Sequence, residues 1–230
     1  MERSLWTGAS GLRVICIVPA YNEETTIGTV VKRARDHANL VLVVDDGSTD
    51  MTSKAAREAG GKVVAHITRL GVGAALSTGL KLALRDGAEI IVTLDADGQH
   101  DPGEIPNVIS PLLERKADLV IGSRLHAENS QMPHYKKLGN KILSKLTSLA
   151  CGTTVTDSQS GFRAFTREVA EIISYSSTDY GWASEMLILL SRRGVRMTHV
   201  PVKALYFKKR VRGAGIKDAV KILYNILRLK

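Results

Sequence analysis

The sequence predicts an α/β fold with a mostly parallel sheet and helices on both of its faces. Strand-like and helix-like patterns alternate through the first half of the chain, and the links between them are short. Such alternation is typical of parallel sheets. The strands are continuous apolar runs, which fits strands that are covered on both sides. The chain has 230 residues, of which 44% are hydrophobic and 24% charged, so we expect a single domain over 1–230.

The first half of the chain, about 13–123, carries the clearest alternation. Its first strand, VICIVPA, is apolar from end to end, and the segment that follows places Ile27, Val30 and Val31 at helical spacing. The predicted strands occupy 14–20, 40–46, 62–67, 89–95 and 118–123. The predicted helices occupy 23–37, 51–60, 73–87 and 103–116.

The pattern changes after Ser123, in the second half of the chain. Residues 124–134 are polar and loop-like. The remaining predicted elements are a helix at 135–149, a strand at 161–166, a helix at 183–193, a strand pair within 195–207, a basic loop at 208–215 and a helix at about 216–230. This final helix has an apolar face beside basic residues, a pattern typical of a helix in a membrane interface. Docking of the helix on the chain's own sheet is the alternative.

Charge is distributed unevenly between the two halves. Residues 1–123 carry 13 basic and 16 acidic side chains, whereas residues 124–230 carry 19 and 7. The second half therefore has a net charge of +12, which indicates an anionic partner such as nucleic acid, an anionic membrane surface or a phosphorylated substrate. A solvated basic surface is the alternative.

The cellular location follows from features of the whole chain. The two cysteines, Cys16 and Cys151, form no disulfide framework, which indicates a reducing compartment. No apolar run approaches the ~18–20 residues of a membrane span, and the first ten residues lack the apolar centre of a signal peptide. We therefore expect a cytosolic protein.

Polar residues follow four of the predicted strands at their carboxyl ends. The sequences at these ends are PAYNEE, DDGSTD, DADGQH and GSR. Ligands of open α/β sheets bind in the crevice beyond the carboxyl ends of the strands. One carboxylate at such a position, for example Asp50, is also explained as a helix cap. Four polar ends on one edge are better explained by a ligand.

The most specific of these ends is DADGQH, with Asp95, Asp97 and Gln99 at alternate positions. Alternate residues of an extended chain point the same way, and two carboxylates so close together repel each other unless a cation lies between them. Oxygen ligands favour a hard ion, Mg²⁺ or Mn²⁺, which commonly takes its remaining ligands from water and substrate phosphates. The expected ligand is therefore a diphosphate.

Six motifs taken together resemble a known family. The series VPAYNEE, VVDDGSTD, RLGVGAALSTGL, TLDADGQH, VIGSR and DSQSGFRAF is similar to the inverting glycosyltransferases of family 2. More narrowly it resembles their dolichyl- and polyprenyl-phosphate hexose synthases, the dolichyl-phosphate mannose synthase group. The resemblance runs from about residue 14 to the final helix. It implies a glycosyltransferase A-type fold and metal-dependent transfer of a hexose from GDP-mannose, UDP-glucose or UDP-N-acetylglucosamine to dolichyl or polyprenyl phosphate.

The resemblance also implies roles for individual residues. The nucleotide pocket is lined by Pro19, Tyr21 and Glu23, with Asp45 and Asp46 at the base or ribose. The metal and the donor phosphates are gathered by Asp95, Asp97 and Gln99. The donor diphosphate or acceptor phosphate is faced by Arg124, Lys136, Asn140 and Arg163. Among all of these, the residues expected to be catalytic are Asp97, Arg124 and Arg163. The half at about 13–123 then binds the nucleotide sugar, and the half at about 124–215 binds the acceptor.

The sequence departs from the family pattern in two places. Val72 stands where the family often has a lysine, so no phosphate contact is expected there. The family's glycine-rich basic loop is matched only loosely, by Lys208, Lys209, Arg210 and Arg212.

Several of these residues have structural explanations as well. Tyr21 is also explained as a packing residue, and Glu23 as a side chain favoured near a helix N-terminus. Lys136 fits a solvated helix face too. Arg163 lies in an apolar strand, where a buried guanidinium needs an anion, so a functional role is favoured. The histidines without metal-ligand spacing are expected to be structural, and these are His66, His100 and His126.

The expected partners are a nucleotide sugar, a lipid phosphate and an anionic membrane surface, and a membrane protein that anchors the chain is a further candidate. The enzyme would then act peripherally on the cytoplasmic face of a membrane. The main alternative is a family 2 transferase that acts on a sugar hydroxyl, for which Glu185 is the candidate general base. A receiver-like signalling module is a remote alternative. The acidic pair of such modules belongs at the end of the first strand, whereas in this sequence it ends the second. A nucleic-acid-binding protein is also remote, because no recognition motif is present.

Overall fold

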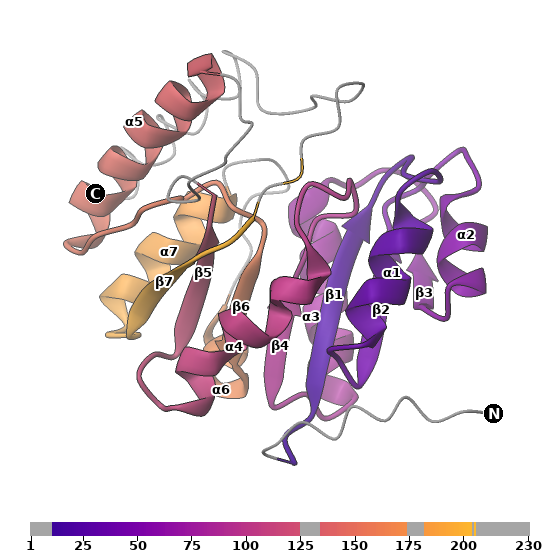
Figure 1. Cartoon of the computed structure of the whole chain (residues 1–230), viewed down its shortest axis with the longest axis horizontal. Coiled ribbons are helices and arrows are strands. Elements are labelled where there is room, and N and C mark those ends of the chain that lie inside the picture. The colour runs from indigo at the N-terminus through magenta and orange to yellow at the C-terminus, as the bar shows by residue number, and fades with distance from the viewer. Residues whose placement is uncertain (1–10, 125–133, 174–181, 204, 206–230) are drawn as a thin grey trace.

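The computed structural model describes residues 11–124, 134–173, 182–203 and 205. Seven strands form one sheet in the order β3-β2-β1-β4-β6-β5-β7 (Figure 1). The strands are β1 (Val14–Ala20), β2 (Leu40–Asp45), β3 (Lys62–Ala65), β4 (Ile90–Thr93), β5 (Leu119–Ser123), β6 (Arg163–Thr166) and β7 (Met197–Pro201). All neighbouring pairs are parallel except those of β6, which runs antiparallel to both β4 and β5. The predicted α/β fold with a mostly parallel sheet is confirmed.

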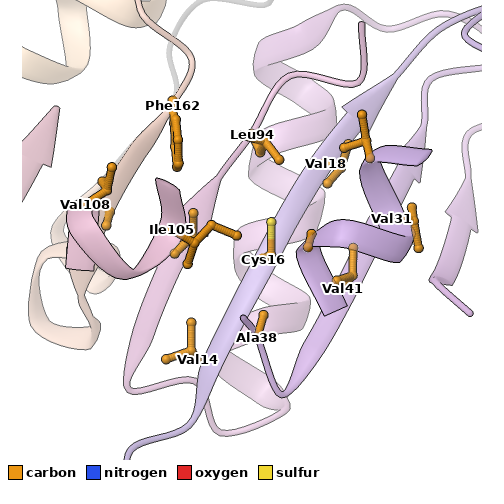
Figure 2. Packing of buried hydrophobic residues seen from close by; sticks show 14 of the residues in the cluster. Val14, Cys16, Val18, Val31, Ala38, Val41, Leu94, Ile105, Val108 and Phe162 are labelled. Atoms are coloured by element: carbon orange, nitrogen blue, oxygen red, sulfur yellow. The ribbon is translucent and has the colours of Figure 1, made fainter. Parts of the chain in front are cut away.

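Helices cover both faces of the sheet. They are α1 (Ile27–Arg35), α2 (Thr52–Glu58), α3 (Val72–Arg85), α4 (Ile105–Leu113), α5 (His134–Cys151), α6 (Arg167–Ile172) and α7 (Trp182–Arg192), with a 3₁₀ turn at Pro102–Glu104. Residues of α1, α2 and α4 pack on one face, against Val14, Cys16 and Val18 of β1 (Figure 2). Residues of α3, α6 and α7 pack on the other face, against Ile15 and Ile17. Alternate residues of β1 are thus buried on opposite sides.

The helix α5 lies outside these two layers. It packs on α7 through a small apolar cluster that includes Leu143 and Ile188, at the end of the sheet formed by β5 and β7 (Figure 1). No helix among the residues that the structure describes has both the length and the apolar character needed to cross a membrane.

The insertion of β6 between β4 and β5 decides what meets at the carboxyl edge of the sheet. The parallel strands β1, β2, β4 and β5 all end at this edge. Because β6 runs the other way, it begins there, so Arg163 and the loop before it reach the same edge. A segment of the second half thereby joins the polar strand ends of the first half.

Some predicted elements differ from the observed ones. The helix α6 was not predicted. It begins after Thr166, whose side-chain oxygen accepts from the backbone N–H of Val169 as an N-cap. Only one strand, β7, is described within the predicted strand pair at 195–207. The basic loop at 208–215 and the final helix at 216–230 lie outside the described residues.

Candidate functional site

Two adjacent aspartates, Asp45 and Asp46, stand at the carboxyl end of β2 and organise the loops around them. Asp45 accepts hydrogen bonds from the backbone N–H of Ser48 and the hydroxyl of Ser53. Asp46 accepts from the N–H groups of Leu70 and Gly71 at 2.9 and 2.8 Å. Both carboxylates are buried. The pair therefore holds the loops after β2 and β3 against the carboxyl edge of the sheet.

The histidine after β3 supports Asp46. His66 Nδ1 lies 2.9 Å from Asp46 Oδ1, and its other ring nitrogen lies 3.0 Å from the hydroxyl of Thr78 in α3. This bridge explains in part how the loop that ends at Gly71 keeps its conformation, with a left-handed φ of 97° at that glycine. His66 thus connects Asp46 to α3 within the candidate site.

The end of β1 meets the loop after β2. Asn22 has a left-handed φ of 54°, and its side-chain oxygen accepts from the backbone N–H of Thr49. Glu23 is buried at the start of the turn into α1. Tyr21 is half-buried, and the Arg69 guanidinium lies 4.3 Å from the centre of its ring, a cation–π arrangement. Together with Pro19 in β1, these side chains lie at the carboxyl edge of the sheet.

Asp95 and Asp97 lie just after β4, and their pKa values are shifted in opposite directions. Desolvation raises the pKa of Asp97 to about 6, and the neighbouring charge of Asp95 adds to this shift. Desolvation also acts on Asp95, but the nearby His100 ring and the charge of Arg124 outweigh it and lower its pKa. The backbone N–H of Gln99 donates to Asp97 Oδ1 at 2.9 Å. The two carboxylates therefore lie close enough together for the charge of Asp95 to act on Asp97.

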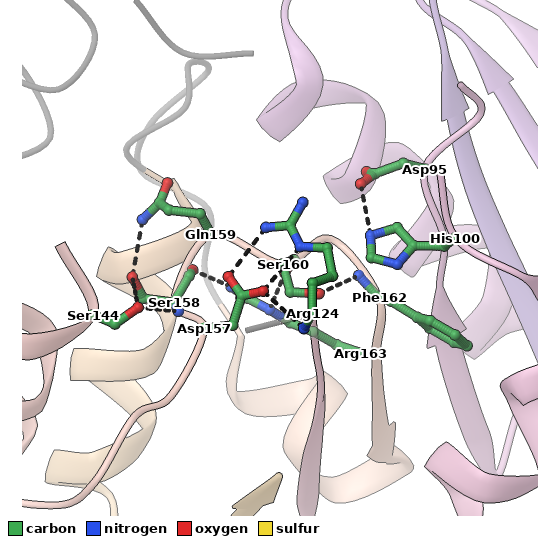
Figure 3. A network of polar contacts seen from close by, with 10 residues as sticks. All are labelled: Asp95, His100, Arg124, Ser144, Asp157, Ser158, Gln159, Ser160, Phe162 and Arg163. Atoms are coloured by element: carbon green, nitrogen blue, oxygen red, sulfur yellow. Dashed lines mark hydrogen bonds and ion pairs between the residues drawn. The ribbon is translucent and has the colours of Figure 1, made fainter. Parts of the chain in front are cut away.

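His100 lies directly beneath this pair. Its ring is fully buried, packs edge-to-face on Phe162 with 5.4 Å between ring centres, and places Nε2 3.4 Å from Asp95 Oδ2 (Figure 3). Neither ring nitrogen has a hydrogen bond of good geometry within the described residues. The ring thus faces the first carboxylate of the pair across 3.4 Å.

The loop before β6 forms the floor of the site. A Cβ at Gly161 would lie 2.6 Å from Cγ of Asp95 and would overlap its carboxylate. The carbonyl of the same glycine accepts from the Thr93 hydroxyl at 2.7 Å. A larger residue at this position would displace the Asp95 carboxylate, so the glycine allows that carboxylate to keep its position.

Arg124, at the end of β5, is bound to a partner within the chain. Its guanidinium donates to both carboxylate oxygens of Asp157, at 2.9 and 3.1 Å, and its backbone N–H donates to the same carboxylate (Figure 3). Both residues are buried. Burial opposes ionisation of Asp157, but the Arg124 charge and its hydrogen bonds lower the pKa of the carboxyl. The end of β5 is thereby fixed to the loop before β6.

Arg163 is fully buried and donates to backbone carbonyls. Its guanidinium contacts the carbonyls of Ser158, Ser160 and Ala183 at 2.8–3.1 Å. The sequence predicts that an anion neutralises this buried charge. In the structure, the backbone carbonyls satisfy it through hydrogen bonds instead. The geometry favours a role in positioning the loop before β6 over direct contact with a substrate.

Hydroxyl and amide groups join this loop to the outer helices. The backbone N–H of Ser158 donates to the Ser144 hydroxyl of α5 at 3.0 Å (Figure 3). The Gln159 side chain donates to the Ser184 hydroxyl of α7. Residues 157–163 therefore contact the carboxylate pair on one side and α5 on the other.

The structure brings most of the predicted site residues to one edge of the sheet. They come from the ends of β1, β2, β4 and β5, and they are Pro19, Tyr21, Glu23, Asp45, Asp46, Asp95, Asp97, Gln99 and Arg124. Asn140 and Lys136 lie on α5, and the side chain of Lys136 is outside the described part of the chain. The residues of the basic loop, Lys208, Lys209, Arg210 and Arg212, are outside it as well, as is His126.

Sequence interpretation assigned no role to Asp157 and Gly161, and it treated His100 as structural. Asp157 and Gly161 stand in the motif DSQSGFRAF, but nothing in that motif indicates which strand end it meets. His100 follows the metal motif directly, so its position was a usable signal.

The fold is that of the glycosyltransferases with an A-type fold. The chain belongs to glycosyl transferase family 2, whose model matches residues 15–173. It is 39% identical to a UDP-N-acetylglucosamine–dolichyl-phosphate N-acetylglucosaminyltransferase of Methanococcus voltae, over 94% of this chain and 96% of that protein. It is 32% identical to an undecaprenyl-phosphate mannosyltransferase of Micrococcus luteus, over 83% of each.

A solved structure has a similar fold. Glucosyl-3-phosphoglycerate synthase from Mycobacterium tuberculosis, crystallised with Mg²⁺ and uridine diphosphate, matches with a TM-score of 0.76 at 22% identity. The match covers 96% of this chain and 80% of that one. The predicted resemblance to family 2 and its polyprenyl-phosphate transferases is confirmed.

Proposed function

We propose that this protein is an inverting transferase that moves a hexose from a nucleotide sugar to the phosphate of a dolichyl or polyprenyl phosphate. The observation that carries the proposal is the pair Asp95 and Asp97 at the carboxyl edge of the sheet. Similarity over nearly the whole chain to a transferase named for dolichyl phosphate supports the acceptor. The candidate donors are GDP-mannose, UDP-glucose and UDP-N-acetylglucosamine.

The carboxylate pair fits a divalent cation, Mg²⁺ or Mn²⁺. Within the described residues no three His, Cys, Asp or Glu side chains form a metal cluster. Asp95, Asp97 and Gln99 would therefore supply only part of a coordination shell, which suits a hard ion that keeps ligands from water and phosphate. Desolvation and then repulsion from Asp95 raise the pKa of Asp97, and a bound cation would favour its charged form. When bound, the ion would offset charge on the departing nucleotide diphosphate.

The other residues would bind and orient the substrates. Asp45, Asp46 and Tyr21 would hold the nucleoside, with Asp46 acting in part through the ordered loop that ends at Gly71. Residues 13–123 would thus form the donor half, and residues 124–215 the acceptor half. In the acceptor half, Lys136 and Asn140 are candidates for the acceptor phosphate.

Catalysis would depend on Asp97 and on two arginines with different tasks. Arg124 lies at a strand end near the carboxylate pair, where its charge lowers the pKa of Asp95. This position suits electrostatic stabilisation of phosphate charge. Arg163 would act through the loop that it holds under Asp95.

The acceptor implies a location. A long-chain lipid phosphate resides in a membrane, so the enzyme would work peripherally on the cytoplasmic face, alone or with a membrane-protein partner. The net charge of +12 in residues 124–230 favours an anionic surface.

The alternative function is transfer to a sugar hydroxyl. A hydroxyl is a poor nucleophile near pH 7, so such an enzyme needs a general base, worth about 10²–10⁴ in rate. A phosphate monoester has a second pKa near 6, so its dianion is already abundant at pH 7. Glu185, in the first turn of α7, is the candidate base in the second half of the chain.

The test compares two acceptors that differ only in the phosphate, polyprenyl phosphate and the matching polyprenol, with each candidate donor and Mn²⁺. We expect sugar transfer to the phosphate alone. We also expect Glu185→Gln to stay within roughly tenfold of wild type, below the range that a base contributes. Lys136→Ala should cost more, because the acceptor loses a cation. Transfer to polyprenol, or an inactive Glu185→Gln variant beside a mild Lys136→Ala, would instead support a hydroxyl acceptor.

A further inference from the structure

We propose that the outer face of α5, defined by Leu138, Ile142, Lys145 and Leu149 together with Lys141, docks on an anionic membrane surface. The large apolar side chains of this face are exposed. Leu138, Ile142 and Leu149 are 61%, 53% and 68% exposed, respectively. Successive helical residues are rotated by about 100°, so these three fall within an arc of about 40°. They form one apolar stripe along the helix.

The opposite side of α5 is already packed. Leu143 and Thr147 are buried, and Leu143 lies in the same small cluster as Ile188 of α7. A helix that docks on its own protein normally places its apolar stripe toward the core and polar residues outward. Here the inner side is satisfied and the outer face is apolar as well. The outer stripe is therefore not explained by packing within the described chain.

Exposed apolar residues elsewhere do not form such a stripe. Within the described residues the other large exposed apolar side chains are Met51, Ile67, Leu70 and Leu113. Single exposed apolar residues are ordinary on protein surfaces, whereas a contiguous apolar patch marks an interaction site.

The charge of α5 selects the kind of partner. The helix sequence contains four lysines and no aspartate or glutamate. Lys141 and Lys145 are exposed, and helical spacing puts them on one edge of the stripe. An apolar stripe flanked by lysines is the pattern of helices that lie in the interface of anionic membranes. A second copy of the same basic face would be repelled.

The position of α5 also connects the surface to the site. Ser144 on this helix accepts from the backbone N–H of Ser158, in the loop that passes beneath Asp95. A docked α5 would hold this edge of the sheet near lipid headgroups. The inference rests on the proposed lipid-phosphate acceptor for its purpose, but it concerns a surface distinct from the carboxylate pair.

The experiment is co-sedimentation of the full chain with mixed phosphatidylglycerol and phosphatidylcholine vesicles and with phosphatidylcholine vesicles alone. The apolar variant is Ile142→Gln with Leu149→Gln, because glutamine keeps helix propensity. Its matched control is Met51→Gln with Leu113→Gln, two residues exposed elsewhere. We expect wild type and control to bind the anionic vesicles, and the apolar variant to bind about tenfold more weakly.

The charge variant is Lys141→Glu with Lys145→Glu, and its matched control is Lys32→Glu with Lys81→Glu. All four lysines are exposed, and both variants change the net charge equally. We expect the α5 variant to lose about tenfold or more in binding to anionic vesicles, and the control to lose much less. Equal losses would show attraction to the net charge of the chain and overturn the proposal.

Two further outcomes would overturn it. One is an apolar variant that binds vesicles as wild type does. The other is a wild-type dimer in sedimentation velocity that the apolar variant dissociates, without vesicle binding. Transfer to a short-chain polyprenyl phosphate in detergent separates this proposal from the proposed function. The α5 variants should keep that activity, whereas a wild type that binds vesicles but transfers no sugar would refute the function alone.

Discussion

Replacing Asp97 by asparagine should stabilise the metal-free protein at pH 8 while it abolishes sugar transfer. Asparagine has the shape of aspartate without its charge, and its side-chain oxygen is still able to accept from the N–H of Gln99. The substitution therefore removes the repulsion from Asp95 and keeps the local turn. A carboxylate whose role is purely structural would behave in the opposite way, because its loss would destabilise the fold.

The magnitude follows from the pKa of Asp97, which is raised from 3.8 to about 6. A raised pKa means that ionisation is disfavoured in the folded state. The stability from this group is fully present below pH 4 and is lost as the pH rises through 6. The shift of about two units corresponds to at most about 3 kcal/mol at pH 8. At about 2–4 °C per kcal/mol, Asp97→Asn should raise Tm by several degrees at pH 8, and by less at pH 5.

The assay is thermal unfolding of EDTA-treated protein at both pH values, followed by addition of Mn²⁺ and uridine diphosphate. Wild type should gain stability from Mn²⁺ with the nucleotide, and Asp97→Asn should lose the Mn²⁺-dependent part. Asp118→Asn is a control of opposite sign, because the hydrogen bond and charge of Arg196 lower the pKa of Asp118. The reasoning is refuted if metal-free Asp97→Asn melts below wild type at pH 8, or if it keeps the Mn²⁺-dependent gain.

Three further predictions concern the surroundings of the pair. Gly161→Ala should weaken Mn²⁺-dependent nucleotide binding at least tenfold in calorimetric titration, because its Cβ displaces the first carboxylate, whereas Gly139→Ala, with open space around its Cβ, should bind normally. Arg124→Ala should cost about 3–5 kcal/mol in urea unfolding, because it leaves a buried carboxylate unpaired, whereas Arg196→Ala, in an exposed pair, should cost much less. His100→Phe should keep the fold and weaken Mn²⁺ binding severalfold; unchanged binding would reduce the histidine to a packing residue.

Most of the fold was predictable because it depends on local patterns. The strand at 14–20 was predicted with its observed bounds, since an apolar run covered on both faces is read from consecutive residues. The place of β6 was not predictable. Its four residues are compatible with either direction, and their neighbours are decided by tertiary pairing with β4 and β5. The short helix α6 was missed for a related reason, because its capping threonine ends a predicted strand.

The candidate site was predictable where its residues follow strands. Asp45, Asp46, Asp95 and Asp97 could be located because parallel strands bring their carboxyl ends to one edge. The partners of Arg124 and Arg163 could not be predicted from the sequence. Nothing in the sequence links Arg124 to Asp157, 33 positions away. That pair exists only because the antiparallel β6 returns the chain to the edge where β5 ends.

The antiparallel strand also explains why a motif of the second half completes a site of the first. Within seven residues, 157–163, the chain binds Arg124 through Asp157, contacts α5 through Ser158 and supports Asp95 at Gly161. Each contact uses a different chemical property: a buried charge, a hydrogen bond and the absence of a side chain. A displacement of α5 would therefore be transmitted through residues 157–163 to Asp95, the proposed metal ligand. The second half of the chain thus contributes to the geometry of the carboxylate pair that follows β4 in the first half.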